Sequence, residues 1–252
     1  MKILLSGINI VKSFVNGEAT QRVLNGITLD IKHGEFVAIM GASGSGKSTL
    51  LYALSGMDNV DSGEVIFNDT DLSTASEIEL ADIRRKEMGF VFQQPTLLKN
   101  LNIIDNIIFP QLRDHKNKIQ SLKEKALNKM EELGIGELSE RSINQVSGGQ
   151  LQRADICRSL MNEPKIIFAD EPTGALNSST SEEIMDIFSQ INENGTAIVL
   201  VTHDIKVASR ADRVLFMKDG AIVGDIELDK YDKQDFKIRL NEVIKHTQKL
   251  GI

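Results

Sequence analysis

A glycine-rich stretch of eight residues, 41–48 with the sequence GASGSGKS, constrains the fold of this chain more than any other feature. It fits the pattern G-x-x-x-x-G-K-[ST], which takes up its structure between a strand and a helix. An apolar run at 36–40 precedes it and indicates a buried parallel strand, and residues 49–54 after it indicate a helix. This order predicts an α/β fold with a mostly parallel core sheet.

The same stretch predicts a phosphate-binding loop. Its glycines let the backbone bend so that several N–H groups point inward, and the helix N-terminus adds partial positive charge. Lys47 can reach the β- and γ-phosphates of a nucleotide, and the Ser48 hydroxyl can ligate Mg²⁺. The alternative, a chance glycine turn, does not require the flanking strand and helix. The loop residues expected to contact nucleotide are Gly41, Ser43, Gly44, Ser45, Gly46, Lys47, Ser48 and Thr49.

Composition limits the function classes. The chain has 252 residues, 41% hydrophobic and 26% charged, which suits a soluble globular domain with room for a subdomain. Its formal net charge of -7 argues against nucleic acid as the main partner, because binding a phosphate backbone needs a basic face. The single cysteine, Cys157, allows no intrachain disulfide and suits a reducing cytoplasm. No apolar run reaches the ~18 residues that a membrane span needs.

Elements outside the phosphate loop follow from local patterns. Residues 3–31 indicate two antiparallel strands that turn at Asn16-Gly17, and 64–67 indicate another strand. From residue 94 to about 147, apolar residues recur at three- and four-residue steps, which indicates an inserted helical segment. Near the end of the chain, 213–224 reads as a hairpin around Asp219-Gly220. The tail from Asp235 predicts a helix with one apolar face formed by Phe236, Leu240, Val243 and Ile244.

Three further apolar runs end in polar residues: Gln93 ends one, Asp170-Glu171 another and His203 the third. Ligands gather at the carboxyl ends of parallel strands. Asp170 can hold Mg²⁺, usually through water, and Glu171 could orient or deprotonate an attacking water. A histidine at a strand end is most often structural, but this position favours His203 as a γ-phosphate contact.

Two other features carry weaker signals. Phe14 lies in the first connection and could stack on an adenine ring, although a core or rim phenylalanine is the alternative. Residues 147–150, Ser-Gly-Gly-Gln, come before an expected helix at 151–162 and form a second candidate anion site. Glycine before a helix is common, so this motif alone decides nothing.

Taken together, the chain resembles the ATP-binding subunits of ABC transporters over roughly residues 3–225. The motifs that carry the resemblance follow in order: Phe14, the phosphate loop at 41–48, Gln93 at the Q-loop, the signature at 146–150, Asp170-Glu171, the D-loop at 174–177 and the switch His203. The resemblance implies a P-loop NTPase with a mostly parallel core sheet, an N-terminal antiparallel β subdomain and an inserted α-helical subdomain. One domain would span 1–252. Its expected parts are a nucleotide-binding core at 1–93 and 154–225, which includes the antiparallel β subdomain, a helical signature subdomain at 94–153 and a C-terminal helical tail at 226–252.

The resemblance also implies cofactors and partners. The cofactors would be ATP and Mg²⁺, with the metal near Ser48, Gln93 and Asp170. Two copies would form a head-to-tail dimer, each ATP lying between the phosphate loop of one copy and the signature of the other. Glu171 would be the catalytic carboxylate, assisted by His203 and Gln93. The partner would be a transmembrane permease, with the chain in the cytoplasm on the inner face of the membrane. The residues expected to contact nucleotide or the second copy are Phe14, Ser147, Gly148, Gly149, Gln150 and Asn177.

Residues 34–44 and 167–176 are similar to the branch that includes macrolide export, lipoprotein release and bacitracin resistance. The tail is similar to peptide-antibiotic detoxification members, so an antimicrobial peptide or similar amphipathic substrate is expected. The chain has Val146 where leucine is usual in the signature, which is a mild change. It also has Asn177 where aspartate is usual, and this second departure puts the D-loop contacts with the other copy in doubt. We also expect residues 95–101, with Leu97, Leu98 and Leu101, to dock the permease; the alternative is that these leucines pack internally.

Two other classes remain open. A soluble ABC-type ATPase in translation or DNA repair usually carries two cassettes or a long coiled-coil insertion. A phosphate-loop metabolic kinase would lack the signature and the switch histidine.

Overall fold

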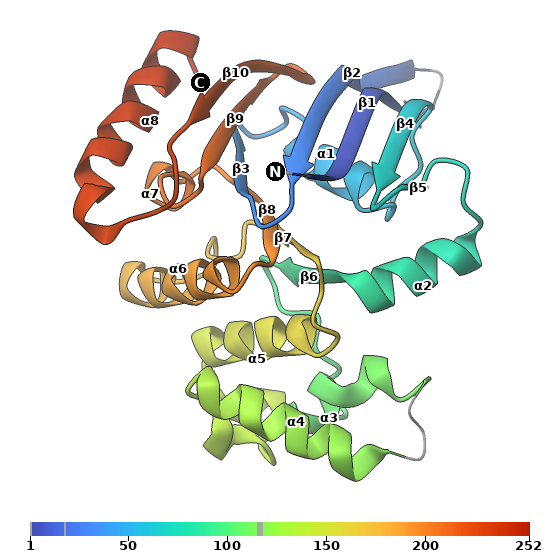
Figure 1. Cartoon of the computed structure of the whole chain (residues 1–252), viewed down its shortest axis with the longest axis vertical. Coiled ribbons are helices and arrows are strands. Elements are labelled where there is room, and N and C mark those ends of the chain that lie inside the picture. Colours follow the sequence, from blue (N-terminus) through green and yellow to red (C-terminus); the bar gives the residue numbers. More distant parts are fainter. Residues whose placement is uncertain (1, 18, 115–117) are drawn as a thin grey trace.

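The computed structural model describes residues 2–17, 19–114 and 118–252 (Figure 1). Within these residues, the strands of the larger sheet are β3 (Phe36–Gly41), β6 (Met88–Phe92), β7 (Ile166–Asp170), β8 (Ala197–Thr202), β9 (Arg213–Lys218) and β10 (Ala221–Glu227). They lie in the order β10-β9-β3-β8-β7-β6. All neighbours pair in parallel except β10, which forms the expected antiparallel hairpin with β9. The predicted α/β fold with a mostly parallel core sheet is therefore confirmed.

The strands of this sheet are buried on both faces. Every residue of β3 and β8 is buried. In β3, Ala38 and Met40 face one hydrophobic cluster, and Val37 and Ile39 face the other. A strand covered on both sides needs apolar residues at successive positions, and this explains the unbroken apolar runs in the sequence.

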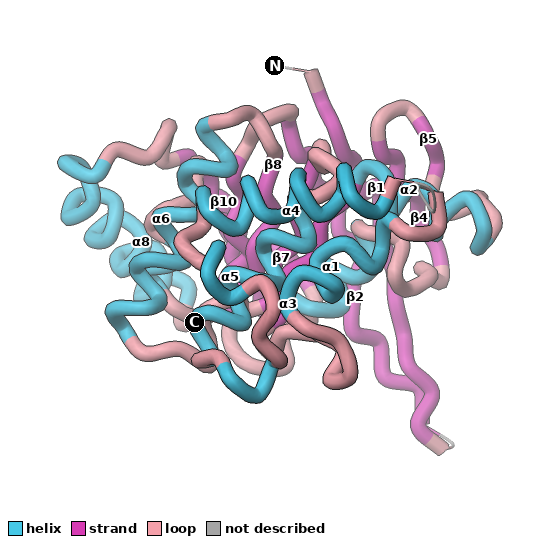
Figure 2. The backbone as a smooth tube through the Cα atoms, turned by 90° about the horizontal axis from the view of Figure 1, so that it is seen from below, coloured by secondary structure: helices cyan, strands magenta, loops and turns pink. Residues whose placement is uncertain are grey.

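A second, antiparallel sheet contains β1 (Ile3–Asn16), β2 (Ala19–Lys32), β4 (Ser62–Phe67) and β5 (Thr70–Asp71), in the order β2-β1-β4-β5. The antiparallel strands predicted at the N-terminus are confirmed, and both are longer than the patterns indicated. The β1–β2 hairpin extends away from the rest of the molecule (Figure 2).

The helices are α1 (Lys47–Leu54), α2 (Glu77–Glu87), α3 (Ile103–Ile108), α4 (Ile119–Glu132), α5 (Gly148–Leu160), α6 (Ser178–Glu193), α7 (Ile205–Ala208) and α8 (Phe236–Leu250). Short 3₁₀ turns occupy η1 (Phe109–Gln111), η2 (Gly136–Leu138), η3 (Ile143–Gln145) and η4 (Lys233–Asp235). Helix α1 packs in the cluster that joins the two sheets, whereas α3 to α6 and α8 pack in the cluster on the other face of the larger sheet. Figure 1 shows α3, α4 and α5 as a layer beyond α6.

Helix α4 lies within the segment predicted to be helical, and Gly134, which has φ 68°, follows its C-cap residue Leu133. Helix α5 does not: the sequence predicted 151–162, but the helix begins at Gly148. Ser147 and Gln150 form a capping box, because each side chain bonds the backbone N–H of the other residue. The two signature glycines therefore lie in the first helical turn.

The tail helix α8 is confirmed, but its buried face differs from the prediction. The most buried residues are Arg239, Val243 and Thr247, whereas the other apolar residues predicted for this face are only half-buried. The Arg239 guanidinium donates to the carbonyl oxygens of Ser209 at 2.8 Å and Ala211 at 2.6 Å, which ties the tail to the core. Within the described residues, no helix combines the length and the apolar composition of a membrane span.

Candidate functional site

The phosphate loop connects β3 to α1, and its backbone approaches neighbouring strands closely. A Cβ on Gly41 would lie 2.3 Å from the carbonyl oxygen of Met217, and one on Gly46 would lie 2.9 Å from that of Val23. Gly44 and Gly46 have positive φ angles of 80° and 98°. Only glycine satisfies both requirements without strain.

The side chains of this loop fit an anionic ligand. Lys47 is 6% exposed, and its Nζ donates to the carbonyl oxygens of Gly41 at 3.0 Å and Ala42 at 2.9 Å. Burial lowers the pKa of Lys47, whereas Glu171 and Asp170 act to raise it. The buried Ser45 Oγ has no hydrogen-bond partner in the part of the chain that the structure describes. A buried hydroxyl without a partner and a charged amine beside the N-terminus of α1 suit phosphate oxygens.

Asp170 stands at the end of β7 and faces α1. The Ser48 Oγ donates to its Oδ1 at 2.9 Å, and the Tyr52 hydroxyl donates to its Oδ2 at 2.8 Å. A hydroxyl and a carboxylate side by side are the hard oxygen donors that Mg²⁺ prefers, and a nucleotide brings the remaining ligands with it. No group of three His, Cys, Asp or Glu side chains in residues 2–17, 19–114 and 118–252 is arranged to hold a metal by itself.

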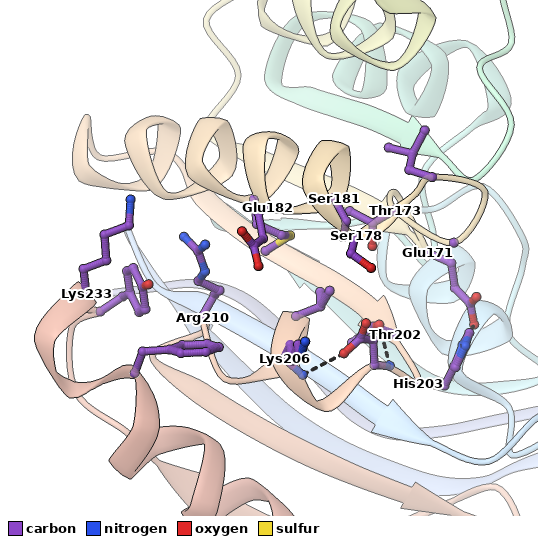
Figure 3. A pocket seen from close by; sticks show the side chains of 17 residues that line it. Glu171, Thr173, Ser178, Ser181, Glu182, Thr202, His203, Lys206, Arg210 and Lys233 are labelled. Atoms are coloured by element: carbon purple, nitrogen blue, oxygen red, sulfur yellow. Dashed lines mark hydrogen bonds and ion pairs between the residues drawn. The ribbon is translucent and has the colours of Figure 1, made fainter. Parts of the chain in front are cut away.

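Glu171, His203 and Gln93 lie together beside Asp170. The Glu171 Oε1 is 3.0 Å from His203 Nδ1 (Figure 3), and Glu171 has φ 47°, which turns it out of the strand direction. A Cβ on Gly174 would lie 2.9 Å from Gln93 Nε2 and 3.3 Å from Glu171 Oε2, so these two side chains meet at the D-loop. A positive φ at a non-glycine residue indicates strain of the kind found at functional sites.

The Glu171–His203 pair forms one end of a cavity of about 450 Å³. As Figure 3 shows, Ser178, Ser181 and Glu182 line it from α6, with Lys206 on the opposite side. Its far end is formed by tail residues, among them Lys233. The Glu171–His203 pair therefore faces open space through which water can enter.

The β1–β2 register places Phe14 near the phosphate loop. Phe14 pairs with Gln21, two residues before Val23, and the carbonyl of Val23 lies against Gly46. The Phe14 ring is 45% exposed, and the Lys12 Nζ lies 5.2 Å from its centroid. The ring is therefore available at the surface rather than buried in the core.

The signature does not meet the phosphate loop within one chain. A Cβ on Gly149 would lie 2.4 Å from Thr180 Cγ2, and the atom nearest a Cβ on Gly148 belongs to Leu176. No hydrogen bond in the described part of the chain joins residues 146–150 to residues 41–49. Asn177, the unusual D-loop residue, caps α6, because its Oδ1 accepts from the Thr180 N–H at 3.0 Å.

The leucines expected to face a partner do not behave alike. Leu97 is only 9% exposed and belongs to the core cluster, so the prediction is wrong for this residue. Its side chain belongs to the cluster on the face of the larger sheet that α3 to α6 cover, whereas Leu98 is 41% exposed. Nearby, α2, β6, η1 and α5 enclose a groove of about 410 Å³. We call it the α2–α5 groove.

Sequence reasoning missed Tyr52, which touches Asp170 directly. A signal was present, because Tyr52 follows Ser48 by four residues on α1, and residues four apart lie on the same helix face.

Comparison with known proteins places these residues in a family context. The family model described as "ABC transporter" matches residues 24–174. The chain is 44% identical over 225 residues to the macrolide export ATP-binding/permease protein MacB of Chlorobium phaeobacteroides, covering 89% of this chain and 34% of that protein. It therefore spans about a third of the length of this relative.

Other similar proteins match along more than nine tenths of their own length. The bacitracin export ATP-binding protein BceA of Halalkalibacterium halodurans is 42% identical over 234 residues, with 92% of each chain covered. Among solved structures, a dimeric post-hydrolysis state of the ATP-binding cassette MJ0796 bound to ADP and Pi has a TM-score of 0.81 and 37% identity. That match covers 90% of this chain and 100% of the cassette.

Proposed function

This chain belongs to the ABC transporter family, and from that premise we propose that it is an ATP-hydrolysing subunit that drives a membrane permease. One observation carries the proposal: Lys47, the Ser48–Asp170 pair and the Glu171–His203 pair converge at the carboxyl ends of β3, β7 and β8. This is the edge of a parallel sheet where ligands bind.

Each group has a chemical role that its surroundings support. The Lys47 ammonium and the N-terminus of α1 neutralise phosphate charge, and the Phe14 ring provides a face for the adenine. Glu171 accepts the proton of the attacking water, and His203 holds its carboxylate in place at 3.0 Å. Mg²⁺, held by Ser48 and Asp170 with Gln93 nearby, would supply charge stabilisation on the phosphates.

We further propose that two copies close head to tail on ATP. The signature at residues 146–150 lies away from the phosphate loop of its own chain, so it is free to complete the site of a second copy. The MJ0796 cassette, which is described as dimeric with ADP and Pi bound, supports a dimer. We assign residues 94–153 as the helical unit that presents the signature.

The α2–α5 groove supports a permease partner. Its lining combines the apolar Met57, Phe90 and Pro110 with the charged Arg84 and Arg158. Met57 in this lining is 46% exposed, and Phe109, which precedes Pro110 in the chain, is 52% exposed. An apolar groove with a charged rim is suited to a short amphipathic segment of another protein. A permease bound there would hold the chain on the cytoplasmic face of the membrane.

The names of two relatives support a proposal about the substrate class. The name of the MacB relative refers to macrolide export, and the name of the BceA relative refers to bacitracin export. We propose that the complex exports, or confers resistance to, an antimicrobial peptide or a similar amphipathic molecule.

The experiment is ATP binding measured by calorimetry, with Mg²⁺ present, for the wild type and Lys47→Ala. Hydrogen bonds to charged groups contribute about 1.5–3 kcal/mol, so we expect the affinity of the variant to fall by about 10- to 100-fold. Lys99→Ala, at an exposed lysine outside the phosphate loop, is the control and should bind like the wild type. Equal affinity in the wild type and Lys47→Ala would refute the nucleotide site.

A further inference from the structure

We propose that Tyr52 is a positioning residue that fixes the Asp170 carboxylate in the orientation needed for the Mg²⁺ that accompanies ATP. The inference rests on the proposed function, because it concerns the same site. It begins from an unusual arrangement: both oxygens of Asp170 accept a hydrogen bond from the same helix, α1.

The two donors fix the carboxylate plane. Ser48 Oγ donates to Oδ1 at 2.9 Å, and Tyr52 donates to Oδ2 at 2.8 Å. A carboxylate held at one oxygen can still rotate about its Cβ–Cγ bond, whereas one held at both oxygens cannot. Because Ser48 and Tyr52 lie four residues apart on one helix face, their spacing is set by the helix itself.

The two donors differ in whether they can also bind a metal ion. The Ser48 hydroxyl is itself a candidate ligand, because a lone pair on its oxygen can bind a cation while its O–H donates to Asp170. Tyr52 lies a full helical turn beyond the phosphate loop and is not a candidate ligand, so its only role toward Asp170 is its bond to Oδ2. Tyr52 therefore holds the second oxygen of Asp170 whether or not Ser48 binds a cation.

Tyr52 is suited to this role by its surroundings. Its ring is half-buried and packs on the hydrophobic cluster between the two sheets, so the hydroxyl has little freedom to move. The phenol hydroxyl is a hydrogen-bond donor, and the acceptor that it meets at 2.8 Å is the Asp170 Oδ2.

The test compares Tyr52→Phe with the wild type. The substitution keeps the ring and its packing and removes only the hydroxyl. ATP binding is measured by calorimetry, first in EDTA and then over a series of Mg²⁺ concentrations. Loss of groups that orient metal ligands typically weakens metal binding 10- to 100-fold. We expect the Mg²⁺ concentration for half-maximal enhancement of binding to rise about tenfold, with ATP binding in EDTA unchanged.

Two controls separate positioning from general effects. Tyr231→Phe alters the only other tyrosine, which lies in the tail against Arg210, and should leave the Mg²⁺ dependence unchanged. Adding Tyr52→Phe to Asp170→Asn should cause no further change, because the two residues act through one contact.

The outcomes are distinct. An unchanged Mg²⁺ requirement in Tyr52→Phe overturns the inference. An equal loss of binding in EDTA and in Mg²⁺ also overturns it, because that result assigns Tyr52 to the stability of the loop. Failure of the wild type to bind ATP at all would instead refute the proposed function.

Discussion

Asp155 carries an ionisable carboxylate in a place that disfavours its charge. It is fully buried in α5, and its Oδ2 has no hydrogen-bond partner in the described part of the chain. Burial raises the pKa of Asp155 to about 6, although Arg158, which bonds the Oδ1, acts to lower it. Because the folded-state pKa lies above the ordinary 3.8, the folded chain binds this proton more tightly than the unfolded chain.

The sign of the effect on stability follows directly. Below about pH 4, Asp155 is protonated in both states and contributes no penalty. Between about pH 4 and pH 6 the unfolded chain ionises first, so the penalty grows, and above about pH 6 it is constant. The gap between about 6 and 3.8 corresponds to about 3 kcal/mol at about 1.36 kcal/mol per pKa unit.

Asp155→Asn removes this titration while keeping the shape of the side chain. The free energy of unfolding is measured by urea denaturation, followed by circular dichroism, from pH 4 to pH 8. The variant-minus-wild-type difference should rise by about 2 kcal/mol between pH 4 and pH 7, because the unfolded chain has already begun to ionise at pH 4. Because only the change of this difference with pH is compared, any pH-independent cost of burying the amide cancels.

Asp186→Asn is the matched control with the opposite sign. Partial burial raises the pKa of Asp186, but Arg210 and Lys233 outweigh it and leave the pKa below its ordinary value. Its variant-minus-wild-type difference should therefore stay nearly flat from about pH 5 to pH 8, and should rise only as the pH falls below about 4. A difference for Asp155→Asn that stays flat from pH 4 to pH 7 would refute the reasoning, because the carboxylate would then carry no burial penalty.

Three further predictions concern the proposed activity. Glu171→Gln keeps the side-chain shape but cannot accept a proton, so it should trap ATP and accumulate a dimer in sizing chromatography; hydrolysis at the wild-type rate would remove Glu171 from its role. Asn177→Asp should leave α6 equally capped and raise the ATPase rate or its cooperativity with the permease about fivefold, corresponding to about 1 kcal/mol; unchanged values of both would show that the asparagine is neutral. A cysteine at the exposed Asn100 should cross-link to a membrane protein in native membranes, whereas one at Ile238, 70% exposed on α8, should not. Equal labelling of both would count against permease docking at residues 95–101, and the native Cys157 should not interfere because burial raises its pKa to about 12.

The sequence predicted the elements whose burial forces a clear pattern. The core strands were found because strands buried on both faces have no polar positions, as in β8. Helix α2 gave no such signal, since Leu80 is its only buried residue among eleven. The start of α5 was misplaced because glycine is a poor helix former, and the capping box of Ser147 and Gln150 overrides that preference locally.

The site was predictable as a set of residues but not as a set of contacts. The pattern around Lys47 specifies a phosphate loop, yet nothing in it shows that Asp170 accepts two bonds from α1. Such contacts depend on how β7 lies against α1, which is a tertiary property. The same limit explains Leu97, whose surroundings are set by the helical layer rather than by its neighbours in sequence.

The structure also connects the signature to the Q-loop through α5. The side chain of Gln152 donates to the carbonyl oxygen of Phe92 at 3.0 Å. Arg158 donates to the carbonyl oxygen and the hydroxyl of Thr96, at 2.9 and 2.7 Å. These two contacts hold the backbone on both sides of Gln93.

Helix α5 therefore connects three regions of the chain. Its N-terminus is the signature, its middle clamps the Q-loop backbone, and its last turn, with Arg158 and Ser159, lines the α2–α5 groove. Thirteen residues make a rod of about 20 Å, too short to bend appreciably. If Gln93 shifted toward a nucleotide, the backbone bonded to Gln152 and Arg158 would have to move with it. A rigid α5 would then displace Ser147 and the wall of the groove together.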